Sequence, residues 1–404
     1  MTGPESERID RAGVRRFWSR FWQPPRPHGQ SIVDRRVSYV ELFYDLVFVV
    51  VISRAAATLA HDVSLRAVID FTVIFGLVWV AWLNGSMYHE LHGREDGRSR
   101  TFIFVQVTIL SVLAVYAATA AGSGGVGFAL SYVVLLVVLS WLWLSVRRRD
   151  EERFQRATGS YLLLMAASMV AIAGSALLDD GPRLVVWAAV VLTWIGLGIM
   201  RFWVSGSTDA MGVTVTDSMV ERFGLFVIIV LGEVVVGVVG GMSATELDGR
   251  VVVTGVLTLI VGSGFWWAYF DLVGGRLPVS EGLRPGFWLY GQLPVALVIA
   301  ASGAAMVGLI EHAGDDHAPA ANAWLLGGGV AVLLVVLIGL AATLRSEDRV
   351  ADRPLALAMA LGACGALLVA AWAPAPWLLS TALVAILAGV WFFGALRTSG
   401  SASA

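Results

Sequence analysis

Ionisable and amide side chains interrupt the long apolar runs of this sequence at few positions, and any chemistry must come from them. Glu41 and Asp45 are four residues apart, which places both on one face of a helix. Glu221 and Arg222 open a later apolar run. Charged groups inside a membrane are costly and commonly mark the path of an ion, a proton or a substrate. The other polar-path candidates are Asn84, Gln106, Asp271 and Gln292.

Two interpretations of this polar set are open. In the first, the side chains form an acidic vestibule for ions or protons, because neighbouring carboxyl groups share protons more readily than isolated ones. In the second, the acids only stabilise helix ends, since a negative charge near a helix N-terminus favours the helix dipole. The second interpretation suits Glu41 and Glu221 better than Asp45 and Asp271, which lie deeper or near a C-terminal end.

Arg54 and Glu233 are the deepest charges in the sequence. At about 1.5 Å per residue, each lies roughly 22 Å from the start of its apolar run. Neither side chain is expected to face lipid as an isolated charge. We therefore predict a buried ion pair between Arg54 and Glu233, acting either as a structural lock or as a gate.

His89-x-x-His92, with Glu90 between the two histidines, has the one-turn spacing of some metal sites. No further ligands accompany the motif, so we expect these histidines to lie in a solvated loop. The sequence contains no phosphate-binding glycine loop, nucleophile elbow or zincin motif. We predict no catalytic residue, no cofactor and no metal site, and we expect that the chain is not an enzyme.

The elements that position these side chains are apolar runs of about twenty residues, the length that spans a bilayer as a helix. The composition is 57% hydrophobic and 14% charged, and the mean hydropathy is +0.77. Little sequence is left for a soluble domain, and nothing indicates a nucleic-acid partner. The fold class is therefore all-α and polytopic, with spans near 39–60, 66–87, 101–121, 127–146, 158–178, 184–204, 219–240, 251–273, 287–310, 322–344, 355–372 and 376–396.

The arginines are distributed unevenly between alternate loops. All 28 basic residues are arginine, and 24 fall on the side that carries both termini. The opposite side has only Arg66, Arg183 and Arg250, which predicts cytoplasmic termini. Residues 1–38 are expected to form a basic cytoplasmic tail containing an amphipathic interfacial helix, and residues 398–404 a second tail. The apolar face of that helix would consist of Val14, Phe17, Trp18, Phe21 and Trp22.

The two halves of the chain resemble each other, which predicts six-helix repeats over 39–204 and 205–397. Six spans is an even number, so the repeats would be parallel, as in some transporters. Four motifs recur in the same order: Val40-Glu41-x-Phe43 with Val220-Glu221-x-Phe223, Trp79-x-Ala81-Trp82-x-Asn84 with Trp266-x-Ala268-Tyr269-x-Asp271, Phe102-x-Phe104-x-Gln106 with Trp288-x-Tyr290-x-Gln292, and Arg147-x-x-Asp150 with Arg345-x-x-Asp348.

The segments 41–49 (ELFYDLVFV) and 221–233 (ERFGLFVIIVLGE) strongly resemble the bacterial low temperature requirement A (LtrA) family. The resemblance extends over nearly the whole chain, including the aromatic second and eighth spans. It implies a multi-pass protein of the bacterial plasma (inner) membrane, and it implies no reaction. A fainter likeness links Phe43-Tyr44-Asp45 to the Phe-Ser-Asp signature of a family of potassium and proton channels, with Tyr44 in place of the serine.

From these features we expect a secondary transporter for a small solute that the sequence does not identify, and proton coupling is one form that such transport could take. Buried charges, internal repeats and the lack of a soluble domain favour transport, although the link from fold to function is an analogy. The alternatives are an ion channel built from six-helix repeats and a membrane-embedded enzyme or lipid-handling protein. The expected partners are the lipid bilayer and a small solute or ion, while the oligomeric state is not readable.

The uneven arginine distribution predicts the orientation of the chain. A reporter fused after Arg397 should show cytoplasmic activity, and a reporter fused near Asp316 should show periplasmic activity. The reverse result at either site would mean that the number of spans is wrong.

Overall fold

The computed structural model describes residues 11–29, 35, 37–205, 215–345 and 353–401. The regular secondary structure of this part of the chain is helical, and two isolated β-bridges join loops. Twelve helices are long and apolar enough to cross a membrane, as predicted. Besides α1 (Arg11–Phe21), the helices are α2 (Tyr39–His61), α3 (Leu65–His92), α4 (Gly97–Ala117), α5 (Gly125–Arg147), α6 (Glu152–Ser175), α7 (Asp180–Ser205), α9 (Asp217–Ala244), α10 (Gly249–Leu272), α11 (Arg284–Glu311), α12 (Ala320–Thr343), α13 (Arg353–Trp372) and α14 (Pro376–Ser401).

Five of the membrane helices begin at a residue whose side chain caps the first turn. In each case an oxygen of the side chain accepts a hydrogen bond from the backbone N–H three residues later. These amide groups have no partner within the helix and would otherwise be left unsatisfied near lipid. The capping residues are Ser38, Ser64, Asp96, Thr216 and Asp248.

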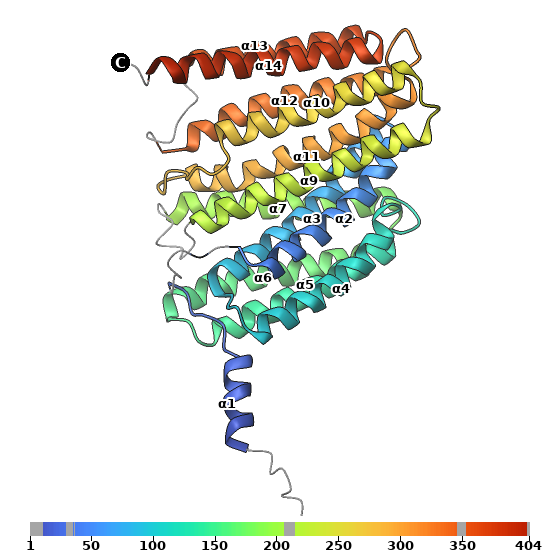
Figure 1. Cartoon of the computed structure of the whole chain (residues 1–404). Helices are drawn as coiled ribbons and strands as arrows, with labels where there is room; N and C mark the ends of the chain where they lie inside the picture. The colour runs from blue at the N-terminus through green and yellow to red at the C-terminus, as the bar shows by residue number, and fades with distance from the viewer. Residues whose placement is uncertain (1–10, 30–34, 36, 206–214, 346–352, 402–404) are drawn as a thin grey trace, which may run out of the picture.

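The twelve helices run side by side in a single bundle (Figure 1). We call the end at which α2 begins the terminal face, because α1 and the end of α14 also lie there, and the opposite end the far face. In Figure 1 the terminal face is on the left. The bundle passes from α4, α5 and α6 through α2, α3 and α7 to α9 and α11, then to α10 and α12, and ends with α13 and α14.

The pairs of packed helices within α2–α7 recur within α9–α14. In the first set, α2 packs on α3 and α4, α5 packs on α4 and α6, and α7 packs on α3 and α6. In the second set, α9 packs on α10 and α11, α12 packs on α11 and α13, and α14 packs on α10 and α13. The same pattern of packed pairs therefore occurs in both sets of helices.

The boundary between the halves is formed by α2, α3 and α7 on one side and by α9 and α11 on the other. Helices α2 and α9 run in the same direction, since Asp45 contacts Arg222 and, further along both helices, Ser53 contacts Glu233. The boundary is not symmetric. Helices α4 and α11 hold corresponding places in the packed pairs, but 78% of the most apolar stretch of α11 is buried, against 33% of that of α4. The difference arises because α11 also packs against helices of the opposite half, whereas α4 does not.

The chain before α2 is part of the folded structure. Helix α1 crosses the direction of the bundle helices at the terminal face (Figure 1), and Phe17 and Trp18 are exposed on it. The following segment docks on α3 through Arg26, which donates hydrogen bonds to the carbonyl oxygens of Glu90 and Gly93, each at 2.8 Å. A guanidinium at this position satisfies carbonyl groups at a helix C-terminus and favours the helix dipole.

Helix α3 continues to His92, beyond the predicted end of this span at residue 87. His89 and His92 are consequently buried rather than in a solvated loop, and the expectation for them was wrong. The docked segment explains the difference, since the ring Nδ1 of His92 lies 2.7 Å from the Arg26 carbonyl oxygen. Hydropathy of α3 alone does not report that another part of the chain covers its end.

Close packing of α2 and α3 depends on Gly85. A Cβ atom at this position would lie 2.2 Å from the Tyr44 hydroxyl oxygen, which is held by Gln106. We expect Gly85→Ala to destabilise the protein by about 1–3 kcal/mol, because the tyrosine ring would have to move. Gly232→Ala is the control, since no atom lies within 4 Å of its Cβ position. Thermal unfolding in detergent should show a lower midpoint only for Gly85→Ala, and equal midpoints would contradict the packing argument.

Candidate functional site

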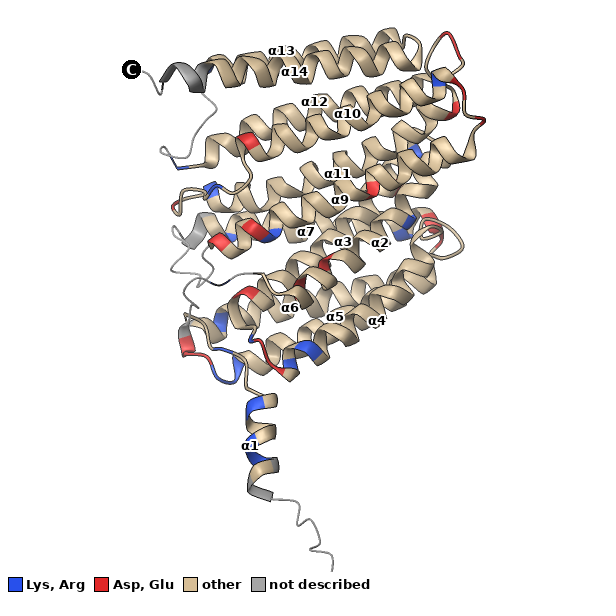
Figure 2. Ribbon diagram, in the orientation of Figure 1, with Lys and Arg blue, Asp and Glu red and all other residues tan. Residues whose placement is uncertain are grey.

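Most charged residues lie near the two ends of the bundle, and few lie along the helices (Figure 2). Asp45 is the most deeply buried of these few, with none of its surface exposed. Its carboxylate accepts hydrogen bonds from Arg222 Nη2 at 2.8 Å and from Arg222 Nε at 3.1 and 3.3 Å. The indole N–H of Trp82 donates to the same carboxylate at 2.8 Å. This two-point pairing links α2 to α9, and hence one half of the chain to the other.

Two further acids and one further arginine extend the pair toward the terminal face. Glu41, one turn before Asp45, lies 3.8 Å from Arg222 Nη1 and 2.6 Å from Arg35 Nη2. Arg35 also forms an ion pair with Glu90 on α3 and donates to the His89 carbonyl oxygen at 3.0 Å. We call Arg35, Glu41, Asp45, Glu90 and Arg222 the charge network.

The charge network reaches the start of α9 by a second route. Glu90 Oε1 accepts hydrogen bonds from the hydroxyls of Thr216 and Ser218, each at 2.7 Å. Thr216 is also the residue that caps α9. The chain just before α2, helices α2 and α3, and the first turns of α9 are thus joined by a single set of polar contacts at the terminal face.

Three carboxyl groups face two guanidinium groups in the charge network, so with all five ionised its net charge is −1. Not every polar atom in it is satisfied. Glu41 Oε2 and Arg222 Nη1 are buried at an ion-pair distance but have no hydrogen-bond partner among the described residues. His89 Nε2 on α3 is also buried and also has no hydrogen-bond partner among the described residues. A buried network with unsatisfied groups can be rearranged at lower cost than a fully satisfied one.

The charge network therefore brings together three of the predicted polar residues, Glu41, Asp45 and Arg222. Gln106 lies next to it, because its Oε1 accepts a hydrogen bond at 2.8 Å from Tyr44, the residue before Asp45. Glu221 does not take part, since it is exposed on a different face of α9 from Arg222.

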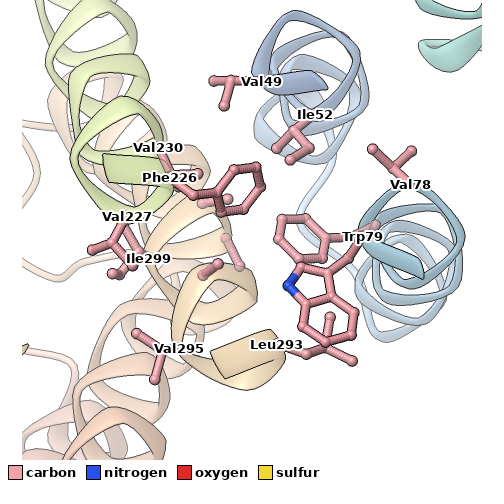
Figure 3. Close-up of a cluster of buried hydrophobic side chains, with 14 of the residues drawn as sticks. Val49, Ile52, Val78, Trp79, Phe226, Val227, Val230, Leu293, Val295 and Ile299 are labelled. Carbon is pink, nitrogen blue, oxygen red and sulfur yellow. The ribbon is translucent and has the colours of Figure 1, made fainter. Parts of the chain in front are cut away.

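Below the charge network, toward the far face, the centre of the bundle is apolar. Figure 3 shows side chains of four helices meeting there, among them Ile52 of α2, Trp79 of α3, Phe226 and Val230 of α9, and Ile299 of α11. Each of these five side chains is buried, with at most 1% of its surface exposed. Along α9 this layer lies between Arg222 of the charge network and Glu233, which is nearer the far face.

Asn84 lies outside the charge network and lines a cavity of about 110 Å³ between the two halves. Its amide nitrogen donates to the Val80 carbonyl oxygen at 2.7 Å, within its own helix. The cavity is also lined by His28, by the hydroxyl-bearing residues Thr158 and Tyr161 of α6 and Tyr290 of α11, and by Arg201 of α7. A cavity of this size holds several water molecules or a small solute.

The three hydroxyls have no hydrogen-bond partner among the described residues, so they are available to a bound molecule. Gly198 makes the position of Tyr290 possible, because a Cβ atom at residue 198 would lie 1.9 Å from the tyrosine hydroxyl oxygen. The indoles of Trp143 and Trp194 form apolar walls beside Tyr161. None of the described residues that line this cavity is a carboxylate, and we call it the junction cavity.

Asp271 and Gln292 lie in the second half, apart from the charge network. Gln292 accepts a hydrogen bond from the hydroxyl of Tyr269 at 3.0 Å, and its amide nitrogen is buried without a partner among the described residues. Asp271 is exposed at the edge of the bundle and accepts a hydrogen bond from the indole of Trp391 on α14 at 2.8 Å. It lines a second cavity, between α10, α12, α13 and α14.

The predicted ion pair between Arg54 and Glu233 is not formed in the structure. Glu233 accepts a hydrogen bond from Ser53, the residue before Arg54, and the Arg54 side chain is exposed on the outer surface of α2. The predicted depth along the helices is correct, but a difference of one residue rotates a side chain by about 100° around a helix. The two charges therefore point in different directions.

Comparison with known proteins identifies the family. The model of the bacterial low temperature requirement A protein family matches residues 36–390. This chain is a member of the LtrA family. It is thus a multi-pass membrane protein of a bacterial family, as the motifs around Asp45 and Glu233 indicated. It is also 28% identical over 243 residues to an uncharacterized protein of Rhizobium meliloti (strain 1021), and the match spans 58% of each chain.

Several residues of the sites in this LtrA family member carry only weak signals in the sequence. Hydropathy assigns Arg35 to the cytoplasmic tail, and Glu90 stands out only as the residue between two histidines. The junction cavity has a periodic signal, because Trp194, Gly198 and Arg201 follow one face of α7 at helical spacing. No cluster of three or more metal-ligating side chains occurs in the described part of the chain.

The pairing of Asp45 with Arg222 can be tested by a double-mutant cycle. Asp45→Leu or Arg222→Met alone should destabilise the protein by about 3–5 kcal/mol, because each leaves a buried charge without its partner. The double variant should recover part of this loss. As a control, Arg66→Met at the exposed pair with Asp70 should change stability by about 1 kcal/mol or less. Thermal unfolding in detergent measures all four variants, and strictly additive effects of the two single substitutions would show that the residues are not coupled.

Proposed function

We propose that this LtrA family member is a secondary transporter of a small solute and not an enzyme. The observation that carries the proposal is the junction cavity, where side chains from both halves direct polar groups into a space at their boundary. Transporters built from repeats commonly bind substrate at such a boundary, in the membrane, and expose it by moving one half against the other. Tyr290 of α11 and Asn84, Tyr161 and Arg201 of the first half are the proposed binding groups.

The lining of the junction cavity favours a class of solute. Its described lining includes a guanidinium, hydroxyls, an amide and the imidazole of His28 but no carboxylate, so it suits a neutral or anionic solute with several hydrogen-bonding groups. The indoles of Trp143 and Trp194 suit a solute with an apolar part. Asn84 is the one residue of the sequence-based polar path that belongs to this site.

We propose further that the two halves are parallel repeats of six helices. Three observations support this relation. Packed helix pairs recur between the halves, Asn84 and its motif equivalent Asp271 both line cavities between equivalent helices, and α2 and α9 run in the same direction. In addition, Ser53 and Glu233, which contact each other, are 180 residues apart, the offset of the motifs that open α2 and α9.

The charge network is proposed to act as a lock on the terminal face. It joins α2 and α3 to the start of α9, so the halves can separate at the terminal face only if the contact between Asp45 and Arg222 breaks. The positive-inside rule supports a cytoplasmic terminal face in the bacterial plasma membrane, with both termini in the cytoplasm. The exposed aromatic residues and arginines of α1 support its contact with the lipid headgroups.

Transport can be tested before the solute is identified. Untargeted metabolite profiles of deletion cells should differ from those of wild-type cells, and the wild-type gene should reverse the difference. Arg201→Gln and Tyr290→Phe should slow uptake of the responsible solute by about tenfold, since each removes a hydrogen bond to a charged or polar group at the site. Arg156→Gln, an exposed arginine on α6, should behave as wild type.

The alternatives give different results. Steep, non-saturating conductance in proteoliposomes, unaffected by Arg201→Gln, would indicate an ion channel. Chemical conversion of a metabolite by purified protein would indicate an enzyme or a lipid-handling protein. Either result would overturn the assignment of a carrier.

A further inference from the structure

A groove of about 320 Å³ lies between α2, α9 and α11 on the far-face side of the apolar layer. Ten of its 18 lining residues are glycine or alanine, so the helix backbones leave space that larger side chains would fill. Ser53 and Glu233 line its deep end, while His61 and Glu311, at the far-face ends of α2 and α11, lie at its mouth.

Glu233 is within the membrane span. It is the seventeenth residue of α9, roughly 24 Å from the start of the helix at about 1.5 Å per residue. Along α9, the buried side chains of Phe226 and Val230 lie between Arg222 of the charge network and Glu233. The groove connects the Glu233 carboxyl with the far face, and the apolar layer separates it from the terminal face.

No cation neutralises Glu233 within the described part of the chain. On α2 the facing groups are Ser53, which donates a hydrogen bond to the carboxyl, and His61, about two turns away at the mouth; Arg54 points outward. The one charged group on α11 that lines the groove is Glu311, also at the mouth. The charged residues of α10 are confined to its two ends, at Arg250 and Asp271.

A carboxylate within a membrane span and without a cation beside it is stabilised when it binds a cation or a proton from solution. A metal cation needs several oxygen ligands, and among the described residues only Ser53 and Glu233 bring polar side chains to the deep end of the groove. A proton needs one carboxylate oxygen and neutralises the charge completely. The chemistry of the site thus selects a proton over a metal ion.

We propose that Glu233 is a proton-binding site that exchanges protons with the far face through the groove between α2, α9 and α11. Binding converts the carboxylate and a hydronium ion into a carboxylic acid and water. Protonation of Glu233 weakens its hydrogen bond with Ser53 of the opposite half, because a hydroxyl donates a stronger hydrogen bond to a carboxylate than to a neutral acid. Protonation therefore weakens a contact between α2 and α9 and favours their relative movement.

This site deepens the proposed function by naming the coupling ion, and it rests on that function only for the coupling step. Proton binding itself can be measured with no solute present. An apolar carbodiimide reacts with protonated carboxyl groups in water-poor sites, and mass spectrometry of peptides locates the adduct. Purified full-length protein should be modified at Glu233, increasingly so as the pH is lowered, while Asp45, paired with Arg222, should stay unmodified.

Two variants test the geometry of the site. Glu233→Gln should lose this adduct, and its unfolding midpoint will show whether it is folded. Ser53→Ala should change the extent of labelling of Glu233 at a fixed pH, because the carboxyl group loses its hydrogen-bond donor on α2. Labelling that does not depend on pH, or that is suppressed by sodium at constant pH, would overturn the assignment of a proton site.

Access from the far face is tested independently of Glu233 substitutions. Cys364 is the single cysteine of the chain, so Cys364→Ala provides a background without thiols. Gly237→Cys, one turn beyond Glu233 in the groove, has room for the new side chain, since the nearest side-chain atom to its Cβ position is a Val307 methyl group at 3.7 Å. A charged, membrane-impermeant thiol reagent added outside whole cells should label it.

Gly232→Cys is the matched control, because it lies on the outward face of the same helix and should not react. One-sided access would be overturned if Gly237→Cys were not labelled. It would also be overturned if the reagent labelled Gly237→Cys equally in inverted and in right-side-out vesicles. If Glu233 titrates and Gly237→Cys reacts but no solute is ever transported, the proton site stands and the proposed transport function fails.

Discussion

The absence of water from the bilayer core is the constraint on which this structure depends. An ionised group there must find an opposite charge, a set of hydrogen-bond donors or a proton. Asp45 finds Arg222 and Trp82, and this requirement fixes α2 against α9. Because the two partners come from different halves, satisfying one carboxylate also determines how the halves meet at the terminal face.

The same constraint has a different solution toward the far face. Glu233 has a serine and a groove rather than an arginine, so solution and not the protein supplies the neutralising charge. Between the two acids lies the apolar layer, across which an isolated charge would pass only at high cost. A fixed pair on one side and an exchangeable proton on the other give the molecule two non-equivalent ends.

Much of this fold could be predicted from the sequence, since the length of a span is set by the bilayer and the run of apolar residues reports it directly. The spacing of Glu41 and Asp45 likewise predicted their shared face. The direction in which a side chain points around the helix axis is harder to predict from the sequence. The sequence therefore predicted Arg54 as the partner of Glu233, whereas the structure has Ser53 there. Contacts made by the chain before α2 were not predictable from hydropathy, which assigns Arg35 and Arg26 to a solvated tail. The junction cavity also depends on α11 entering the first half, an asymmetry that repeated motifs cannot reveal.

The 177 residues that separate Asp45 from Arg222 affect how the chain is made. At a synthesis rate of about 5–20 residues per second, roughly ten to thirty seconds pass between the appearance of the aspartate and that of its arginine. Asp45 must enter the membrane during this interval without its arginine, and α3, which carries Trp82, is made soon after α2. Until α9 is inserted, the first six helices therefore hold a carboxylate that lacks its arginine.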